Sequence, residues 1–293
     1  MNSKSTIARL TGDRGRVEHV FAVLSESLDP DTTACALFEN RAGDWTVAIY
    51  CRDAPDETAL RARIAPAVGP QVAARIAFET VVAEDWVKAS LAGLTPVTAG
   101  RFVVHGAHDR ARIAPNRVGI EIEAALAFGT GHHGSTRGCL LVLDRMLKAR
   151  RPRRILDVGT GTGVLAIAAA RTLRAGVLAS DIDPQAVTTA RANARVNRVC
   201  AKVHVIHAAG LNHRSFRLRG GYDLVFANIL LNPLRRLARP LARVLASGGR
   251  VVLAGLLPQH GNAACAAYRT QGLALDRWIA VDGWVTLVLR RGR

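Results

Sequence analysis

Hydrophobic positions in the first 85 residues recur at spacings that predict two helices among short strands. Between residues 16 and 28, the apolar side chains Val17, Val20, Phe21, Leu24 and Leu28 share one face of a helix. Further along, the pattern predicts a helix over 57–68 and strands over 5–13, 35–39, 45–51 and 75–82. The order β-α-β-β-α-β is that of a ferredoxin-like α+β module.

From about residue 154 the pattern changes to short apolar runs that alternate with amphipathic helical segments. The expected strands are 155–158, 177–180, 203–208, 224–227 and 250–254, and the expected helices are 163–172, 183–197, 233–245 and 260–271. Such alternation predicts a doubly wound, mostly parallel α/β sheet with helices on both faces. Residues 278–290 add two strands around Asp282-Gly283, an expected antiparallel hairpin at the sheet edge.

These patterns divide the chain into a ferredoxin-like domain over 1–92, a linker over 93–116 and an α/β domain over 117–293. A short helix is expected over 85–91. The 93–100 stretch of the linker contains Pro96 and two glycines, and the pattern beyond it predicts strands over 101–105 and 117–122.

Composition favours a soluble protein of the cytoplasm. The 293 residues are 49% hydrophobic, yet no run approaches the roughly 18 apolar residues of a membrane span, and the first residues lack the apolar region of a signal peptide. The five cysteines are widely separated and form no C-x-x-C pair, so we expect buried or incidental thiols in a reducing compartment.

The net charge of +17 is unevenly distributed. Residues 1–100 carry 10 basic and 13 acidic side chains, whereas residues 101–293 carry 30 basic and 10 acidic ones. The basic half is compatible with a nucleic-acid partner and equally with a solvated, arginine-rich surface. The densest basic cluster, over 145–154, contains no aromatic residue for base stacking.

The strongest chemical signal is the glycine-rich turn at 159–163, between a predicted buried strand and a helix. Glycines accept positive φ and allow a ligand to approach the backbone, and the helix N-terminus offers free N–H groups. A dinucleotide fingerprint needs glycines at the first, third and sixth positions. Here they are Gly159, Gly161 and Gly163, and the sixth position is Val164. This spacing disfavours NAD and fits a nucleoside without a pyrophosphate.

Two further polar residues end predicted strands. Asp181 lies 22 residues after Gly159, where a carboxylate accepts from ribose hydroxyls, whether of NAD or of S-adenosylmethionine. Asp183, before Pro184, is expected to cap the next helix. Asn228 ends the fourth strand of this region, where its amide oxygen could orient an amine, and Asn232 is expected to cap the following helix.

Four segments together resemble the PrmA-type methyltransferases, which modify protein eleven of the large ribosomal subunit. They are FGTGHHGST at 128–136, DVGTGTGVLAI at 157–167, SDIDPQAV at 180–187 and ANILLNPL at 227–234. The resemblance covers roughly residues 120–255, and the N-terminal module is similar to that family's substrate-recognition domain. The FGTG segment is the most specific element, because class I methyltransferases in general lack it.

The resemblance implies a Rossmann-like class I methyltransferase that moves methyl groups from S-adenosyl-L-methionine to lysine side chains and the N-terminal amine of the ribosomal protein. The cofactor contacts implied are Thr136, Gly159, Asp181, Asn228, Gly161, Phe128 and Thr130. No residue stands out as a dedicated base. The sulfonium methyl is already activated, so alignment of an uncharged amine is the main requirement.

Two positions depart from the family pattern. Ser135 replaces the usual Thr and keeps the hydroxyl, whereas Gly134 replaces Pro or Glu and is expected to loosen the backbone before Thr136. The adjacent histidines His132 and His133 predict no metal site, because neighbours on one loop rarely both ligate.

Three alternatives stay open on sequence alone. The acceptor could be another protein lysine or an RNA base, although Asn228-Ile-Leu lacks the aromatic on which base methylators stack a flipped base. The chain could be a non-catalytic ribosome-assembly factor, or an NAD-dependent oxidoreductase, which Val164 disfavours. Under the favoured reading, the slightly acidic N-terminal module suits a basic ribosomal protein, and the basic half could make a transient contact with the ribosome or its RNA.

Overall fold

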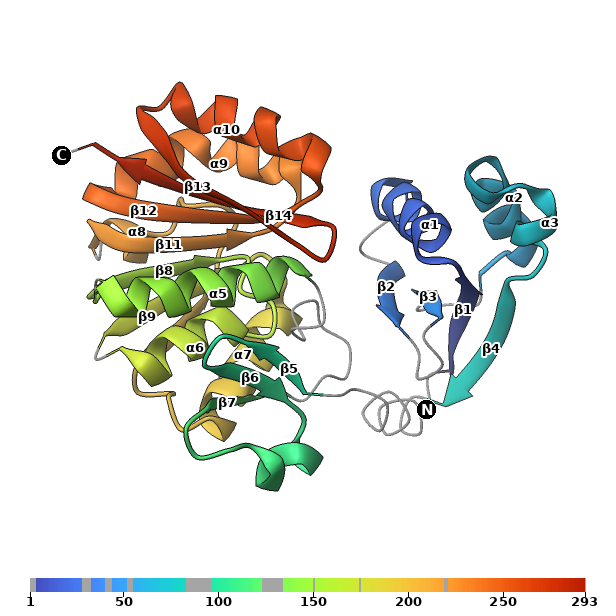
Figure 1. Cartoon of the computed structure of the whole chain (residues 1–293), viewed down its shortest axis with the longest axis horizontal. Coiled ribbons are helices and arrows are strands. Elements are labelled where there is room, and N and C mark those ends of the chain that lie inside the picture. The colour runs from blue at the N-terminus through green and yellow to red at the C-terminus, as the bar shows by residue number, and fades with distance from the viewer. Residues whose placement is uncertain are drawn as a thin grey trace. The chain divides into compact units, whose positions relative to one another are not determined.

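The computed structural model describes residues 4–27, 33–39, 44–51, 55–82, 96–122, 134–149, 151–173, 175–218 and 221–292 (Figure 1). The chain forms two compact units, Met1–Gly93 and Leu94–Arg293. The elements of the first unit are β1 (Lys4–Gly12), α1 (Arg14–Ser27), β2 (Thr33–Glu39), β3 (Trp45–Cys51), α2 (Glu57–Val68), α3 (Pro70–Ala73) and β4 (Ala77–Val82).

The first unit is an antiparallel sheet in the order β2-β3-β1-β4. Helix α1 packs on this sheet and α2 packs against α1. The residues expected on one helix face, including Val17, Val20 and Leu24, are buried together with Ile7 and Ile49 from the strands. The ferredoxin-like prediction is confirmed for this unit, while the helix expected over 85–91 lies outside the described residues.

A small sheet opens the second unit. It consists of β5 (Val97–Ala99), β6 (Phe102–His105) and β7 (Val118–Glu121), and the 3-10 helix η1 (Ala107–Arg112) connects the last two strands. A linker was expected over 93–116, but the structure, which describes these residues from 96 onward, has two strands and a 3-10 helix there. Phe102 and Val104 are buried against the larger core, and that burial makes this segment part of the second unit.

The large sheet has seven strands in the order β10-β9-β8-β11-β12-β14-β13. Five are parallel, and β14 and β13 form the predicted antiparallel hairpin at one edge. The strands are β8 (Arg154–Val158), β9 (Gly176–Asp181), β10 (Val203–His207), β11 (Tyr222–Asn228), β12 (Leu245–Leu256), β13 (Leu273–Val281) and β14 (Trp284–Arg291).

Helices cover both faces of this sheet, as the alternating pattern predicts. One core contains side chains from α5 (Gly134–Ala149), α6 (Val164–Thr172) and α7 (Pro184–Val196), together with the small sheet. The other contains side chains from α8 (Arg214–Leu218), α9 (Leu231–Val244) and α10 (Gly261–Arg269). The central strands β8 and β11 are buried from both sides, which explains why their sequences read as nearly continuous apolar runs, whereas the edge strand β13 is largely exposed.

The two predicted helix caps have different outcomes. Asp183 caps α7 as expected, because its carboxylate accepts a hydrogen bond from the Gln185 N–H at 2.8 Å. The prediction for Asn232 is wrong, since α9 begins two residues earlier with Leu230 at the N-cap, and Asn232 lies inside the helix. Pro233 is accepted there because the first turn of a helix needs no N–H partner for it.

Gly134 does not loosen the chain before Thr136, contrary to expectation. It is the first residue of α5 and is buried. A Cβ at Gly134 would meet the Val281 carbonyl oxygen, and one at Gly138 would meet the Thr286 hydroxyl, both well inside van der Waals distance. The two glycines therefore let α5 lie directly on the β13–β14 hairpin.

Cys51, Cys139 and Cys265 are buried free thiols, as expected, whereas Cys200 is exposed. Burial raises the pKa of each buried thiol. Within the ranges that the structure describes, no helix combines the length and apolar content needed to cross a membrane.

Replacing Gly138 by alanine tests the close packing of α5. Alanine improves helix propensity by about 1 kcal/mol, but its methyl group must displace the buried Thr286, and overpacking costs about 1–3 kcal/mol. We expect G138A to lower the free energy of unfolding, as measured by urea denaturation. Gly176→Ala is the matched control, because its Cβ would meet no atom closer than 4.0 Å; equal stability of the two variants would contradict the packing argument.

Candidate functional site

The register of three parallel strands brings the predicted residues to one edge of the sheet. Val158 at the end of β8 pairs with Ser180 of β9 on one side and with Ala227 of β11 on the other. The next residue of each strand or its loop is therefore Gly159, Asp181 or Asn228. The chain order of the strands reverses at β8, and ligands of open α/β sheets bind at the carboxyl ends beside such a switch point.

The glycine-rich turn after β8 requires glycine at three positions. Gly159, Gly161 and Gly163 have φ values of +68°, +53° and +83°, in the left-handed region that disfavours other residues. A Cβ at Gly159 would also overlap the Ile229 side chain. The turn is held to β9 by hydrogen bonds from the N–H groups of Gly159 and Thr160 to the Ser180 carbonyl, at 2.9 and 3.0 Å.

Asp181 holds the turn from the neighbouring strand. Its Oδ2 accepts a hydrogen bond from the Gly161 N–H at 2.8 Å, and its Oδ1 accepts one from the Asp183 N–H at 3.1 Å. The side chain is half-buried, so its two oxygens keep further lone pairs toward the edge of the sheet. Asp181 is thus a structural partner of the glycine turn as well as a candidate ligand group.

Asn228 and Thr136 meet although they lie far apart in the sequence. The Asn228 Nδ2 donates to the Thr136 Oγ1 at 3.2 Å. Thr136 is buried in the first turn of α5, whereas Asn228 is half-buried at the end of β11. Because the amide nitrogen is engaged by Thr136, the carbonyl oxygen of Asn228 is left as an acceptor for a donor group.

Asp157 is the buried carboxyl group of the site. It is 1% exposed, and its Oδ2 accepts hydrogen bonds from the Thr160 hydroxyl at 2.6 Å and the Ala166 N–H at 3.2 Å. Its Oδ1 has no hydrogen-bond partner within the described part of the chain. Burial raises the pKa of Asp157, the two hydrogen bonds lower it and nearby Asp181 adds a smaller rise, so that the pKa is about 7.

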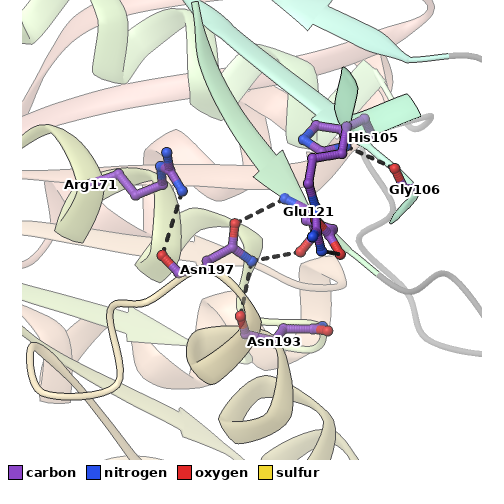
Figure 2. A network of polar contacts seen from close by, with 7 residues as sticks. His105, Gly106, Glu121, Arg171, Asn193 and Asn197 are labelled. Carbon is purple, nitrogen blue, oxygen red and sulfur yellow. Dashed lines mark hydrogen bonds and ion pairs between the residues drawn. The ribbon is translucent and has the colours of Figure 1, made fainter. Parts of the chain in front are cut away.

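A network of buried amides connects the glycine turn with the end of β7. Figure 2 shows the part of this network around Glu121, Asn193 and Asn197. The Asn193 side chain donates to the Thr162 carbonyl at 2.9 Å. One turn later on α7, Asn197 accepts from the Glu121 N–H at 2.9 Å and donates to the Glu121 and Asn193 carbonyls. Glu121 also binds Arg110 through two contacts of 2.6 Å, so the end of β7 is held on both sides.

Of the seven predicted cofactor contacts, the structure brings five to the edge of the sheet around β8. Gly159, Gly161, Asp181 and Asn228 lie there through strand register, and Thr136 joins them through its hydrogen bond to Asn228. Phe128 and Thr130 lie outside the described residues. No group of three or more His, Cys, Asp or Glu side chains suited to a metal ion occurs in the part of the chain that is described.

Sequence reasoning missed the second set of residues that hold this site. Asp157 carried a usable signal, since a lone carboxylate inside the apolar strand run 155–158 is costly to bury without purpose. Asn193 and Asn197 carried little signal, because amides near the end of a helix are usually solvated or capping residues. Their role depends on contacts with residues 31 and 76 positions away.

The seven-stranded sheet and the glycine turn at its switch point define the class of Rossmann-like α/β nucleotide-binding enzymes. Residues 23–292 match the protein family described as Ribosomal protein L11 methyltransferase (PrmA). The chain is 54% identical over 280 residues to the ribosomal protein L11 methyltransferase of Bradyrhizobium diazoefficiens, covering 96% of this chain and 95% of the relative.

A relative of the same name from Brucella suis is 41% identical over 282 residues, covering 96% of this chain and 97% of the relative. Among solved structures, the ribosomal protein L11 methylase of Lactobacillus delbrueckii subsp. bulgaricus aligns with a TM-score of 0.61 and 25% identity, covering 68% of this chain and all of that chain. The chain belongs to the PrmA family of ribosomal protein L11 methyltransferases.

The raised pKa of Asp157 predicts a pH-dependent stability. A carboxyl group whose folded pKa of about 7 exceeds the unfolded value of 3.8 stabilises the fold below pH 3.8, and this contribution is lost as pH rises toward 7. We expect D157N, which keeps an oxygen for Thr160 and Ala166, to reduce the loss of unfolding free energy between pH 5 and pH 7. At most about 1.4 kcal/mol per pH unit is at stake.

Urea denaturation at pH 5, 6 and 7 measures this effect. Asp183→Asn, at the exposed cap of α7, is the control and should leave the pH dependence as in the unchanged protein. Parallel pH profiles for all three proteins would show that Asp157 does not titrate in this range.

Proposed function

We propose that this methyltransferase moves methyl groups from S-adenosyl-L-methionine to amines of ribosomal protein L11, namely lysine side chains and the N-terminal amine. Membership of the PrmA family and the names of the relatives support the substrate. The observation that carries the proposal is the single row of Gly159, Asp181 and Asn228 at the switch point, with Thr136 bonded to Asn228.

The residues present fit a nucleoside with a cationic side chain. Three left-handed glycines expose the backbone of the turn, which opens directly into the N-terminus of α6. The Asp181 carboxylate suits ribose hydroxyls. The buried Oδ1 of Asp157 is an unsatisfied acceptor beside the same turn, and such an atom suits the ammonium group of a methionine moiety. We assign Phe128 and Thr130 to the same ligand from the family motif alone.

When bound, the cofactor supplies a methyl group activated by its positively charged sulfur. The chain's own residues then have to position the acceptor amine, since no strong base is required if the amine arrives uncharged. The Asn228 carbonyl oxygen, held in place by the hydrogen bond from its amide to Thr136, would accept an N–H of that amine and orient its lone pair.

We assign substrate recognition to the first unit, whose slightly acidic charge suits a basic ribosomal protein. The second unit is strongly basic, and we propose that it makes a transient contact with ribosomal RNA. A protein that modifies a newly made ribosomal protein would act in the cytoplasm.

Replacing Asp181 by alanine tests the ribose assignment. Loss of a charge-assisted hydrogen bond costs about 1.5–3 kcal/mol, so we expect affinity for S-adenosyl-L-methionine to fall roughly 10- to 100-fold in isothermal calorimetry. Asp181→Asn, which keeps an oxygen for the Gly161 N–H, should lose less.

Asp183→Ala is the matched control for this measurement. It removes a carboxylate two residues away and should cost about 1 kcal/mol of stability through the lost helix cap, with affinity unchanged. Equal affinities of the Asp181 and Asp183 variants would refute the assignment of Asp181 to the ligand.

The acceptor is tested by incubating the full chain with labelled methyl donor and separated ribosomal components. We expect label in ribosomal protein L11, and mass spectrometry of its peptides should place the methyl groups on lysines and on the N-terminal amine. Asn228→Ala should lower kcat more than it weakens cofactor binding, because the amide acts on the amine. Label in RNA, or in another protein in preference to L11, would overturn the substrate assignment.

A further inference from the structure

One face of the second unit is basic without any acidic side chain. The helices α8, α9 and α10 lie on this face, and they contain seven arginines and no aspartate or glutamate. The connecting stretches 208–213, 229–230, 257–260 and 270–272 contain no acidic residue either. All seven arginines are exposed: Arg214, Arg217, Arg235, Arg236, Arg239, Arg243 and Arg269.

Four of these arginines belong to α9 and form a stripe along it. Arg235, Arg239 and Arg243 are spaced by four residues, so they follow one side of the helix about 6 Å apart along its axis, with Arg236 beside them. The opposite side of α9, including Leu234, Ala238 and Leu241, is buried on the sheet. The helix thus carries its whole charge on the solvent side.

Some arginines elsewhere in the second unit have partners. Arg191 donates to the Val205 carbonyl and Arg250 pairs with Asp276. In the basic cluster over 145–154, Lys148 lies 3.8 Å from Asp144. Within the described residues, the four α9 arginines make no hydrogen bond or ion pair. Four guanidinium groups on one helix, with no counter-charge on the surrounding helices, repel one another unless an anion lies among them.

The stripe borders a groove of about 550 Å³ between α9 and the end of α10. Arg235, Arg236 and Arg239 line it together with the neutral groups of Asn232, Thr270 and Gln271. The two helices lie side by side over the sheet (Figure 1), and the buried Tyr268 hydroxyl of α10 donates to the Leu234 carbonyl of α9 at 3.0 Å. The two helices that carry the groove are therefore held together by a contact that does not involve the arginines.

We propose that this groove and the arginine stripe of α9 bind the phosphate backbone of RNA, which gives the RNA contact of the proposed function a definite place. Guanidinium groups bind phosphates through two parallel hydrogen bonds. The side-chain amides of Asn232 and Gln271 suit the 2′-hydroxyls that distinguish RNA from DNA. The groove residues include no aromatic side chain on which a base could stack, so recognition is of backbone and shape rather than sequence.

The test measures binding of the full chain to a labelled RNA duplex of about 16 base pairs by fluorescence anisotropy over a range of salt concentrations. Replacing Arg235, Arg236 and Arg239 together by glutamine should weaken binding at least tenfold at 0.1 M salt. The slope of log Kd against log salt concentration should fall by about 2 to 3, since each lost phosphate contact removes nearly one counterion.

A triple variant of Arg145, Arg277 and Arg290 is the matched control. These exposed arginines are scattered over α5, β13 and β14, and their replacement by glutamine changes the net charge equally. It should weaken binding less than threefold. Equal losses in the two triple variants would mean that only net charge attracts RNA, and the proposal would be wrong.

Two further ligands separate RNA from other anions. A DNA duplex of the same length and a polyglutamate of equal charge should both bind more weakly than the RNA duplex. Tighter binding of DNA would exclude a role for the 2′-hydroxyls, and tighter binding of polyglutamate would indicate an acidic protein as the partner. Absence of RNA binding by the unchanged protein would also overturn the proposal.

Two further measurements, thermal unfolding and methyl transfer to free ribosomal protein L11, separate a loss of RNA binding from a loss of folding or of enzymatic activity. Thermal unfolding should be unchanged in the α9 triple variant, and transfer to free ribosomal protein L11 should be retained, because these arginines lie outside the methyl-transfer site. The single variant Arg239→Gln, with an expected two- to fivefold loss of RNA affinity, answers the question even if the triple variant does not fold. Failure of methyl transfer by the unchanged protein would instead refute the proposed function.

Discussion

The pairing of β8 with two parallel neighbours is the constraint on which the site depends. Backbone hydrogen bonds set the register of β8 against β9 and β11, and a slip of one residue would move every side chain to the other face. Because the three strands end in register, Gly159, Asp181 and Asn228 meet at one edge without any direct bond between their side chains. The positions of these three residues are therefore fixed by the backbone hydrogen bonds of the central strands.

The site is rigid because each flexible piece is held by a buried polar group. Three left-handed glycines permit the turn after β8, but they would also allow other conformations. One conformation is selected by hydrogen bonds that the carboxyl groups of Asp157 and Asp181 accept and the Asn193 amide donates. The unsatisfied oxygen of Asp157 is the cost of this arrangement in the isolated chain. A ligand with a cationic donor would remove that cost, which links binding to stability.

The two faces of the large sheet have different duties. The α5–α7 face holds the glycine turn and the end of β7 through buried amides, and its packing includes glycines that bring α5 onto the terminal hairpin. The α8–α10 face contributes to the core through apolar residues and leaves its arginines in solvent. Because the proposed RNA-binding face and the proposed methyl-transfer edge are separate, RNA bound to α9 would leave the edge of the sheet accessible.

The sequence by itself determined the order of the elements, the ferredoxin-like and doubly wound sheets and the residues that end the parallel strands, because hydrophobic period and glycine spacing are local properties of the chain. It also located Asp183 as a cap, where a residue's neighbours decide its role. Tertiary structure decided what depends on distant partners: the pairing of β5, β6 and β7 into a small sheet, the bond between Asn228 and Thr136, the unsatisfied oxygen of Asp157 and the contacts of the Asn193 and Asn197 amides. Asn232 was misassigned because α9 begins two residues before Pro233, and only packing against the sheet settles where a helix begins.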